Sequence, residues 1–188
     1  MNQNKKGFTP IVIIIILIIV ILLGWAGYWI MTQNQPPNLI KQNSVIDPRN
    51  ATYIIFEKQV RLVNGISEKE GDPGSASKII TKYFGNEVKA DFNGDGIDDI
   101  AFILTWSGGG SGTFYFVSAV LSQGNSFKGT NAMLIGDRIA PQTTEFQNGE
   151  IIVNYADRKP GDSMADIPSV GVSKYFKIIN DTIVEVKK

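Results

Sequence analysis

The chain has 188 residues with 18 basic and 18 acidic side chains, and it contains neither cysteine nor histidine. The lack of cysteine excludes disulfides, thiolate nucleophiles and zinc-thiolate sites, and the lack of histidine excludes Ser-His-Asp and Cys-His catalysis and His-ligated metals. Lys5 and Lys6 are the only charged residues before residue 31, so the rest of the chain carries 16 basic against 18 acidic groups; with no concentrated basic face, we predict no nucleic-acid partner.

The first predicted element is a transmembrane helix over residues 11–31, which carry no charge. About 20 residues at about 1.5 Å of rise each span the roughly 30 Å hydrocarbon core. Its isoleucines favour a strand in water, but a lone segment in lipid satisfies its backbone only as a helix. Lys5 and Lys6 precede the segment and aromatic residues close it, so we expect residues 1–10 in the cytoplasm. The sequence therefore predicts a single-pass cell-membrane protein with an extracytoplasmic C-terminal domain.

Two alternatives concern processing of this segment. A cleaved signal peptide normally has an apolar region of about 7 to 15 residues and a small-x-small cleavage site, which only "GWAG" approximates here. The stretch "KKGFTP" resembles the leader of type IV prepilins over residues 5–25, and this resemblance implies cleavage between Gly7 and Phe8. The chain departs from that family at the mature fifth position, where most pilins have Glu and this chain has Val12.

A linker is predicted over residues 32–50, "TQNQPPNLIKQNSVIDPRN". The segment is rich in Asn, Gln and Pro, it has no sustained apolar period, and its Pro-Pro pair favours extended polyproline geometry. We expect it to space the folded domain, residues 51–188, from the membrane.

The domain is predicted to be α+β, mainly antiparallel β with one short helix. Tight hairpin turns are expected where short apolar runs flank residues that accept positive φ, at Asn64-Gly65, Asn148-Gly149 and Asn180-Asp181. Two apolar runs, residues 100–106 and 113–121, are predicted to form the central and most buried strands.

The short helix is predicted within "DPGSASKIITKYFGN". Ser75 or Ser77 offers an N-cap, apolar residues recur at helical spacing, and Gly85 offers a termination signal. We expect two to three turns.

A calcium loop is predicted in "DFNGDGIDDIAF", which begins at Asp91. Oxygen-bearing side chains recur at every second position of the loop, Gly96 permits a sharp turn, and Ile97 can offer its backbone carbonyl as a ligand. Three carboxylates facing one point repel each other, and a hard divalent cation removes that cost. An EF-hand needs a Glu at the twelfth position, which is Phe102 here.

The spacing DxNxDGxxD instead resembles the calcium loops of integrin-type FG-GAP and VCBS repeats. This resemblance implies side-chain ligands at Asp91, Asn93, Asp95 and Asp99, with calcium as a structural cofactor. The alternative is an empty turn in which Asp and Asn side chains cap the local backbone.

Further candidates lie in later loops. "WSGGGSGTF" lacks the Gly-Lys-Ser/Thr ending of a P-loop, so we expect a hairpin loop, with a backbone nest for an anion or glycan as the alternative. A groove for a carboxylate or sugar is a second hypothesis, lined by Arg138, Glu145, Asp157 and Arg158. Carboxylate pairs also run glycoside hydrolysis, for which Glu145, Asp157 and Asp162 are the candidates.

Residues 51–180 also resemble a family of bacterial single-pass extracytoplasmic proteins of uncharacterised function, through "GSASKI", "YFGNE", "GSGTFY", "GDRIAPQTTE", "GEIIVNYADR" and "PSVGVSKYFK". The resemblance implies no activity. The sequence favours a non-enzymatic role, that of a membrane-anchored binding or structural module stabilised by calcium with a cell-surface or envelope ligand. A type IV pilin-like component and a carboxylate-dependent cell-wall hydrolase are the alternatives.

Overall fold

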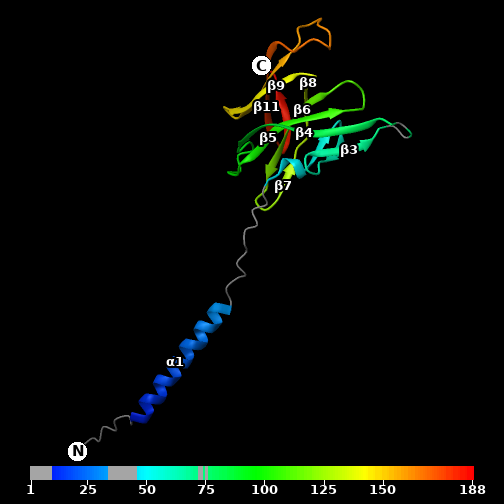
Figure 1. Ribbon diagram of the computed structural model, residues 1–188. Coiled ribbons are helices and arrows are strands. Elements are labelled where there is room, and N and C mark those ends of the chain that lie inside the picture. Colours follow the sequence, from blue (N-terminus) through cyan, green and yellow to red (C-terminus); the bar gives the residue numbers. More distant parts are fainter. Residues whose placement is uncertain (1–9, 34–45, 72–73, 75) are drawn as a thin grey trace, which may run out of the picture. The chain divides into compact units, whose positions relative to one another are not determined.

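The computed structural model describes residues 10–33, 46–71, 74 and 76–188 (Figure 1). The chain divides into two compact units, Met1–Gln42 and Asn43–Lys188. The predicted cytoplasmic N-terminus up to residue 9, the prepilin-like cleavage site and linker residues 34–45 lie outside the described residues. The end of the predicted linker belongs to the second unit, because Pro48–Asn50 form a 3-10 helix, η1, at its start.

The first unit contains helix α1 (Pro10–Gln33), which covers the predicted membrane segment. Its described apolar side chains are exposed, among them Leu23 and Trp25. Within the described residues, no helix meets the length and hydropathy needed to cross a membrane.

The second unit is built from antiparallel sheets, which confirms the mainly antiparallel β prediction. Its strands are β1 (Thr52–Ile55), β2 (Lys58–Arg61), β3 (Ile66–Glu70), β4 (Lys78–Ala90), β5 (Asp99–Ser107), β6 (Phe114–Ser122), β7 (Phe127–Gly129), β8 (Met133–Asp137), β9 (Ala140–Gln147), β10 (Glu150–Asp157), β11 (Val170–Ile179) and β12 (Thr182–Val186). They form a two-stranded sheet (β1-β2), a four-stranded sheet (β12-β11-β10-β9) and a six-stranded sheet (β3-β4-β5-β6-β7, with β8 also paired to β6).

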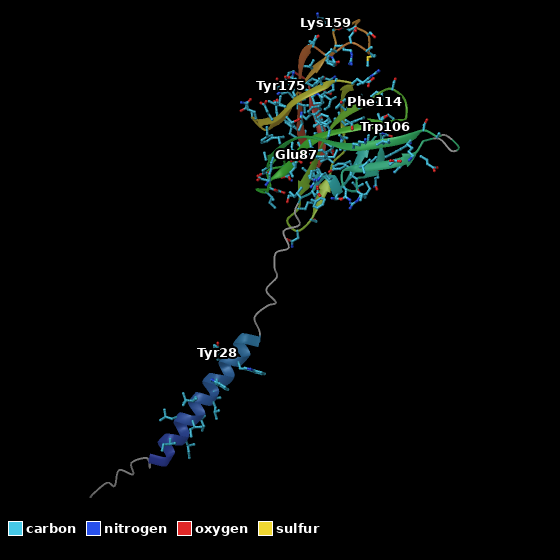
Figure 2. All side chains as sticks on the ribbon, viewed as in Figure 1. Tyr28, Glu87, Trp106, Phe114, Lys159 and Tyr175 are labelled. Atoms are coloured by element: carbon cyan, nitrogen blue, oxygen red, sulfur yellow. The ribbon has the colours of Figure 1, made fainter. Side chains whose placement is uncertain are left out.

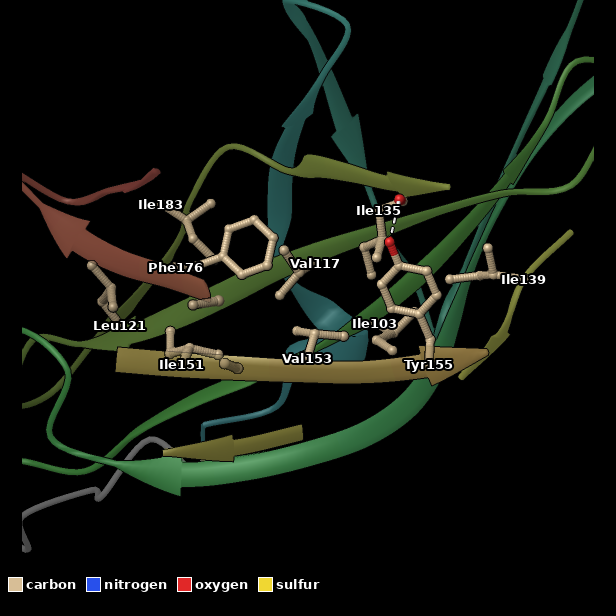
Figure 3. Packing of buried hydrophobic residues seen from close by; sticks show 12 residues of the cluster. Ile103, Val117, Leu121, Ile135, Ile139, Ile151, Val153, Tyr155, Phe176 and Ile183 are labelled. Atoms are coloured by element: carbon tan, nitrogen blue, oxygen red, sulfur yellow. Dashed lines mark hydrogen bonds between the residues drawn. The ribbon is translucent and has the colours of Figure 1, made fainter. Parts of the chain in front are cut away.

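The six-stranded sheet has a hydrophobic core on each face. On one face, alternate residues of β5 and β6 pack against β8 and the four-stranded sheet; this core includes Ile103, Val117, Ile151, Val153 and Phe176 (Figure 3). The Tyr155 hydroxyl in the same core donates to the Ile135 carbonyl at 3.4 Å, so its polar end is satisfied. Two sheets packed face to face in this way make a β-sandwich.

On the other face, the remaining residues of β5 and β6 pack against the β1-β2 hairpin. This second core includes Tyr53, Ile55, Phe102, Leu104 and Phe116. Phe102 is fully buried, and its ring lies 5.3 Å from the rings of Tyr53 and Tyr83. The prediction that residues 100–106 and 113–121 form the central, most buried strands is therefore confirmed.

The predicted helix within "DPGSASKIITKYFGN" is wrong: from Lys78 onward this stretch is part of β4. Its helix-like spacing arises because the strand is covered on both faces. Tyr83 packs on Phe102 on one face and Phe84 on Tyr115 on the other. The β-branched run Ile79-Ile80-Thr81 also fits a pleated sheet better than a helix. Within the described part of the second unit, η1 is the short helix.

Two of the three predicted hairpin turns are confirmed, and the third differs. Both central residues have positive φ at Asn148-Gly149, between β9 and β10, and at Asn180-Asp181, between β11 and β12. Asn64-Gly65 also turns with positive φ, but it is flanked by a single bridge between Val63 and Ile66. The β1-β2 hairpin instead turns at Phe56-Glu57, where φ is 49° and 61° without any glycine or asparagine.

We predict that Glu57→Gly stabilises the protein by about 0.5–1 kcal/mol. A non-glycine residue in the left-handed region costs about 1–2 kcal/mol, and this relief outweighs the conformational entropy that glycine adds to the unfolded chain. Chemical denaturation measures the change. The control is Glu70→Gly, an exposed β-strand position with ordinary φ, which should lower the free energy of unfolding; a loss of stability in both variants contradicts the prediction.

Candidate functional site

The acidic loop connects β4 to β5 and is held by its own side chains. The Asp91 carboxylate accepts hydrogen bonds from the backbone N–H groups of Gly94 (2.7 Å), Asp95 (3.2 Å) and Gly96 (2.8 Å). These bonds, the one from Gly96 above all, lower the pKa of Asp91. The Asp95 carboxylate accepts from the N–H of Ile97 at 2.8 Å. The loop therefore has the side-chain capping that the empty-turn alternative expects.

Asp99 ties the acidic loop to the central sheet. Its carboxylate is fully buried and accepts from the backbone N–H of Ser122 in β6 (2.8 Å) and of Phe92 in the loop (3.0 Å). Burial raises the pKa of Asp99, and the nearby charges of Asp95 and Asp91 raise it further. No described residue forms an ion pair with Asp99, whereas Asp98 pairs with Lys89 at 3.5 Å.

The predicted calcium ligands therefore share one loop, where the carboxylates of Asp91, Asp95 and Asp99 each bind different backbone N–H groups. No group of three or more acidic, His or Cys side chains suited to a metal ion occurs among residues 10–33, 46–71, 74 and 76–188. Calcium at Asp91, Asn93, Asp95, Ile97 and Asp99 stays a prediction.

The second candidate site brings three of its four residues together. Arg138 and Arg158 are joined through the backbone, because Arg158 Nη1 donates to the Arg138 carbonyl at 3.0 Å. Arg158 Nε donates to the carbonyl of Asp166 at 2.8 Å, which fixes the loop between β10 and β11. The Asp157 carboxylate accepts from the N–H of Arg158 at 2.8 Å, and Arg138 pairs with Asp137 at 3.0 Å. These groups mainly bind one another and the backbone.

Glu145 lies away from this cluster. It stands opposite Ile152 near the middle of the β9-β10 ladder, whereas Asp157 is at the end of β10. The Glu145 carboxylate accepts from Thr143 Oγ1 at 2.8 Å and from Asn154 Nδ2 at 3.3 Å. The Asp162 carboxylate accepts from the N–H of Lys159 at 3.0 Å. The structure thus separates Glu145 from the other residues of the predicted groove.

The glycine-rich loop joins β5 to β6, as a hairpin loop does. A Cβ on Gly108 would lie 2.7 Å from the Trp106 ring, and one on Gly112 would lie 3.0 Å from the Phe114 ring. Glycine is therefore needed here because the loop backbone packs closely on two aromatic rings.

Sequence reasoning missed the larger of two described cavities. It measures about 550 Å³ and is lined by Ile46, Asp47, Pro48, Arg49, Tyr83, Glu87 and Ile100. A smaller cavity of about 260 Å³ lies beside β4 and β5 and is lined by Ile80, Lys82, Thr105, Trp106, Ser107 and Thr113. Figure 2 shows that Glu87 lies far from Lys159, so the larger cavity is separate from the loop that Arg158 holds.

The missed cavity has a simple explanation in the sequence. The composition of residues 32–50 predicts a linker that includes Asp47 and Arg49, and the apolar spacing around Tyr83 predicts a helix, so neither pattern indicates a shared cavity. The available signal was Asp47-Pro48, an N-cap residue followed by proline at the first helical position, which indicates an ordered turn.

Comparison with known protein families, with curated proteins and with solved structures gives no match for this chain.

We predict that Arg158→Lys destabilises the protein by about 1 kcal/mol, because an ammonium cannot reproduce the fork that bridges two carbonyls. Hydrogen exchange should show faster exchange at Ser169, whose N–H donates to the Asp157 carbonyl at 2.8 Å at the end of the loop. Arg61→Lys on β2 is the matched control and should leave both measurements unchanged. Equal exchange at Ser169 in wild type and Arg158→Lys would refute the bridging role.

Proposed function

We propose that the protein is a membrane-anchored extracytoplasmic binding or structural module whose β domain is stabilised by calcium. The proposed anchor rests on the uncharged stretch of residues 11–31. Insertion of this stretch would bring no charged side chain into the hydrocarbon core. Lys5 and Lys6 on its N-terminal side support a cytoplasmic N-terminus. The membrane is then the first partner, and the ligand lies in the cell envelope or on the cell surface.

The proposal of calcium rests on the electrostatics of Asp99. A buried carboxylate that accepts two backbone N–H bonds but has no cationic partner is costly in its charged form. A nearby positive charge stabilises that charged form further. Asp91 and Asp95 add negative charge close by, as their effect on the pKa of Asp99 indicates. A calcium ion would offset the repulsion and fix the entry of β5 into the central sheet.

A non-enzymatic role is supported by how the polar groups are used. The carboxylates proposed for glycoside hydrolysis, Glu145, Asp157 and Asp162, each accept hydrogen bonds from neighbouring groups. Glu145 is also separated along the sheet from Asp157, and a glycosidase pair must flank one bond at about 5–9.5 Å. The arrangement favours a binding or structural module over a hydrolase.

We predict that calcium raises the melting temperature of the full-length protein. At 10 mM, about 100 times a dissociation constant of about 0.1 mM, binding adds about 2.7 kcal/mol to the free energy of unfolding. That corresponds to an increase of roughly 5 to 11 °C over the value in chelator. Asp95→Ala should abolish the increase.

Asp98→Ala is the control for this melt, because Asp98 lies in the same loop but outside the ligand set and is exposed. It should keep the calcium response. Equal melting temperatures in chelator and in calcium would show that the acidic loop is a self-capped turn.

For the anchor, we predict that the full-length protein stays in the membrane fraction after carbonate extraction and keeps Met1. Mass spectrometry of the extracted protein reads the N-terminus directly. A mature N-terminus at Phe8 would instead establish the pilin-like alternative, and release by carbonate would refute integral anchoring.

A further inference from the structure

One wall of the larger cavity is the η1 turn, which holds a charged pair in place. Arg49 Nε pairs with the Asp47 carboxylate at 3.0 Å, and Asn50 Nδ2 donates to the same carboxylate at 2.7 Å. The buried Tyr53 hydroxyl donates to the Pro48 carbonyl at 2.6 Å and so fastens the turn to the core. No described residue accepts from the two terminal nitrogens of Arg49, whose side chain is 60% exposed. The Nε edge of the guanidinium is thus held by Asp47, and its two terminal nitrogens are available to a ligand.

A second part of the lining comes from an irregular segment of β4, which contributes Tyr83 and Glu87. The register with β5 shifts twice between Tyr83 and Val88, and φ is positive at Gly85 (105°) and Asn86 (52°). Asn86 Nδ2 donates to the Gln142 carbonyl of β9 at 3.2 Å, which holds the bulge in place. Bulges of this kind re-aim side chains next to binding sites.

Within this irregular segment, the Tyr83 hydroxyl donates to the Glu87 carboxylate. Burial, followed by this hydrogen bond, raises the pKa of Tyr83, so the phenol stays protonated at neutral pH. In the η1 turn, burial alone would raise the pKa of Asp47, but the hydrogen bonds from Arg49 and Asn50 outweigh it and lower the pKa. The Asp47 carboxylate therefore acts as an acceptor across the neutral range.

The cavity also has the size of a small-molecule site. Its volume of about 550 Å³ lies within the roughly 300–1,000 Å³ typical of such sites. Ile46, Pro48 and Ile100 supply apolar surface to the lining. The lining is therefore mixed, with these apolar residues beside two carboxylates, a guanidinium and a phenol.

We propose that this cavity binds a neutral saccharide. Two carboxylates and one guanidinium give the site a formal charge of about −1, which disfavours phosphate and other anions. A hydroxyl group both donates and accepts, so vicinal hydroxyls of a sugar satisfy a carboxylate and the free edge of Arg49 together. The site deepens the binding role proposed above and rests on it, by naming the class of its ligand.

The test is saturation-transfer difference NMR on the full-length protein in lauryldimethylamine oxide, a detergent without a sugar head group. The probes are D-glucose, D-galactose, N-acetyl-D-glucosamine, cellobiose and diacetylchitobiose, each titrated in chelator. We expect saturable binding of at least one of them. Arg49→Gln and Glu87→Gln should each weaken that binding by about tenfold or more, because each removes a charged hydrogen-bonding partner.

Arg61→Gln and Glu70→Gln are the matched controls, since they make the same changes at exposed strand positions that do not line the cavity. Their affinity should equal that of the wild type. Failure of all five sugars to bind, or equal binding by Arg49→Gln and wild type, overturns the proposal. Binding of inorganic phosphate or tri-alanine in place of a sugar, lost in Arg49→Gln, also overturns the saccharide assignment. Because the titrations contain chelator, their outcome is independent of the calcium and anchor tests.

Discussion

The burial of strands β5 and β6 on both faces is the constraint on which the domain depends. Ala101, Ile103, Val117 and Ala119 face the four-stranded sheet, while Phe102 and Phe116 face the β1-β2 hairpin. Neither outer layer can bury its apolar side without this central pair. The buried Ser118 of β6 is satisfied, because its Oγ donates to the Asn131 carbonyl at 3.1 Å.

Two polar loops lie at the ends of this central pair. Asp99 begins β5 and binds the N–H of Ser122 at the end of β6, so the acidic loop is anchored to both strands. At the opposite end, the glycine-rich loop joins β5 to β6, and the N–H of Thr113 donates to the Asp137 carboxylate at 3.0 Å. Loops positioned by a rigid sheet in this way are the usual carriers of binding function.

The larger cavity follows from the second core. Tyr53 and Tyr83 both pack on Phe102, and their hydroxyls point to polar partners at the edge of that core. The 3-10 turn η1 and the bulge of β4 are held next to each other by backbone bonds, since Gly65 N–H donates to the Arg49 carbonyl and Tyr83 N–H to the Gly65 carbonyl, each at 2.8 Å. A Cβ on Gly65, where φ is 84°, would also approach Tyr83 to 3.4 Å. The turn at Asn64-Gly65 therefore links the η1 turn to β4.

Local physics in the sequence determined the antiparallel β class, the apolar helix-forming segment of residues 10–33, the two central strands and the turns at Asn148-Gly149 and Asn180-Asp181. Each depends on near-neighbour patterns, namely hydrophobic runs and residues that tolerate positive φ.

Tertiary structure alone decided that residues 78–90 form a strand, because pairing with β3 and β5 outweighed the helical spacing of their apolar residues. It also decided the Phe56-Glu57 turn, where contacts of Phe56 with the rings of Trp106 and Phe116 offset an unfavourable φ. The convergence of Arg49 with Glu87 and the separation of Glu145 from Asp157 depend on strand register, which no short-range pattern encodes.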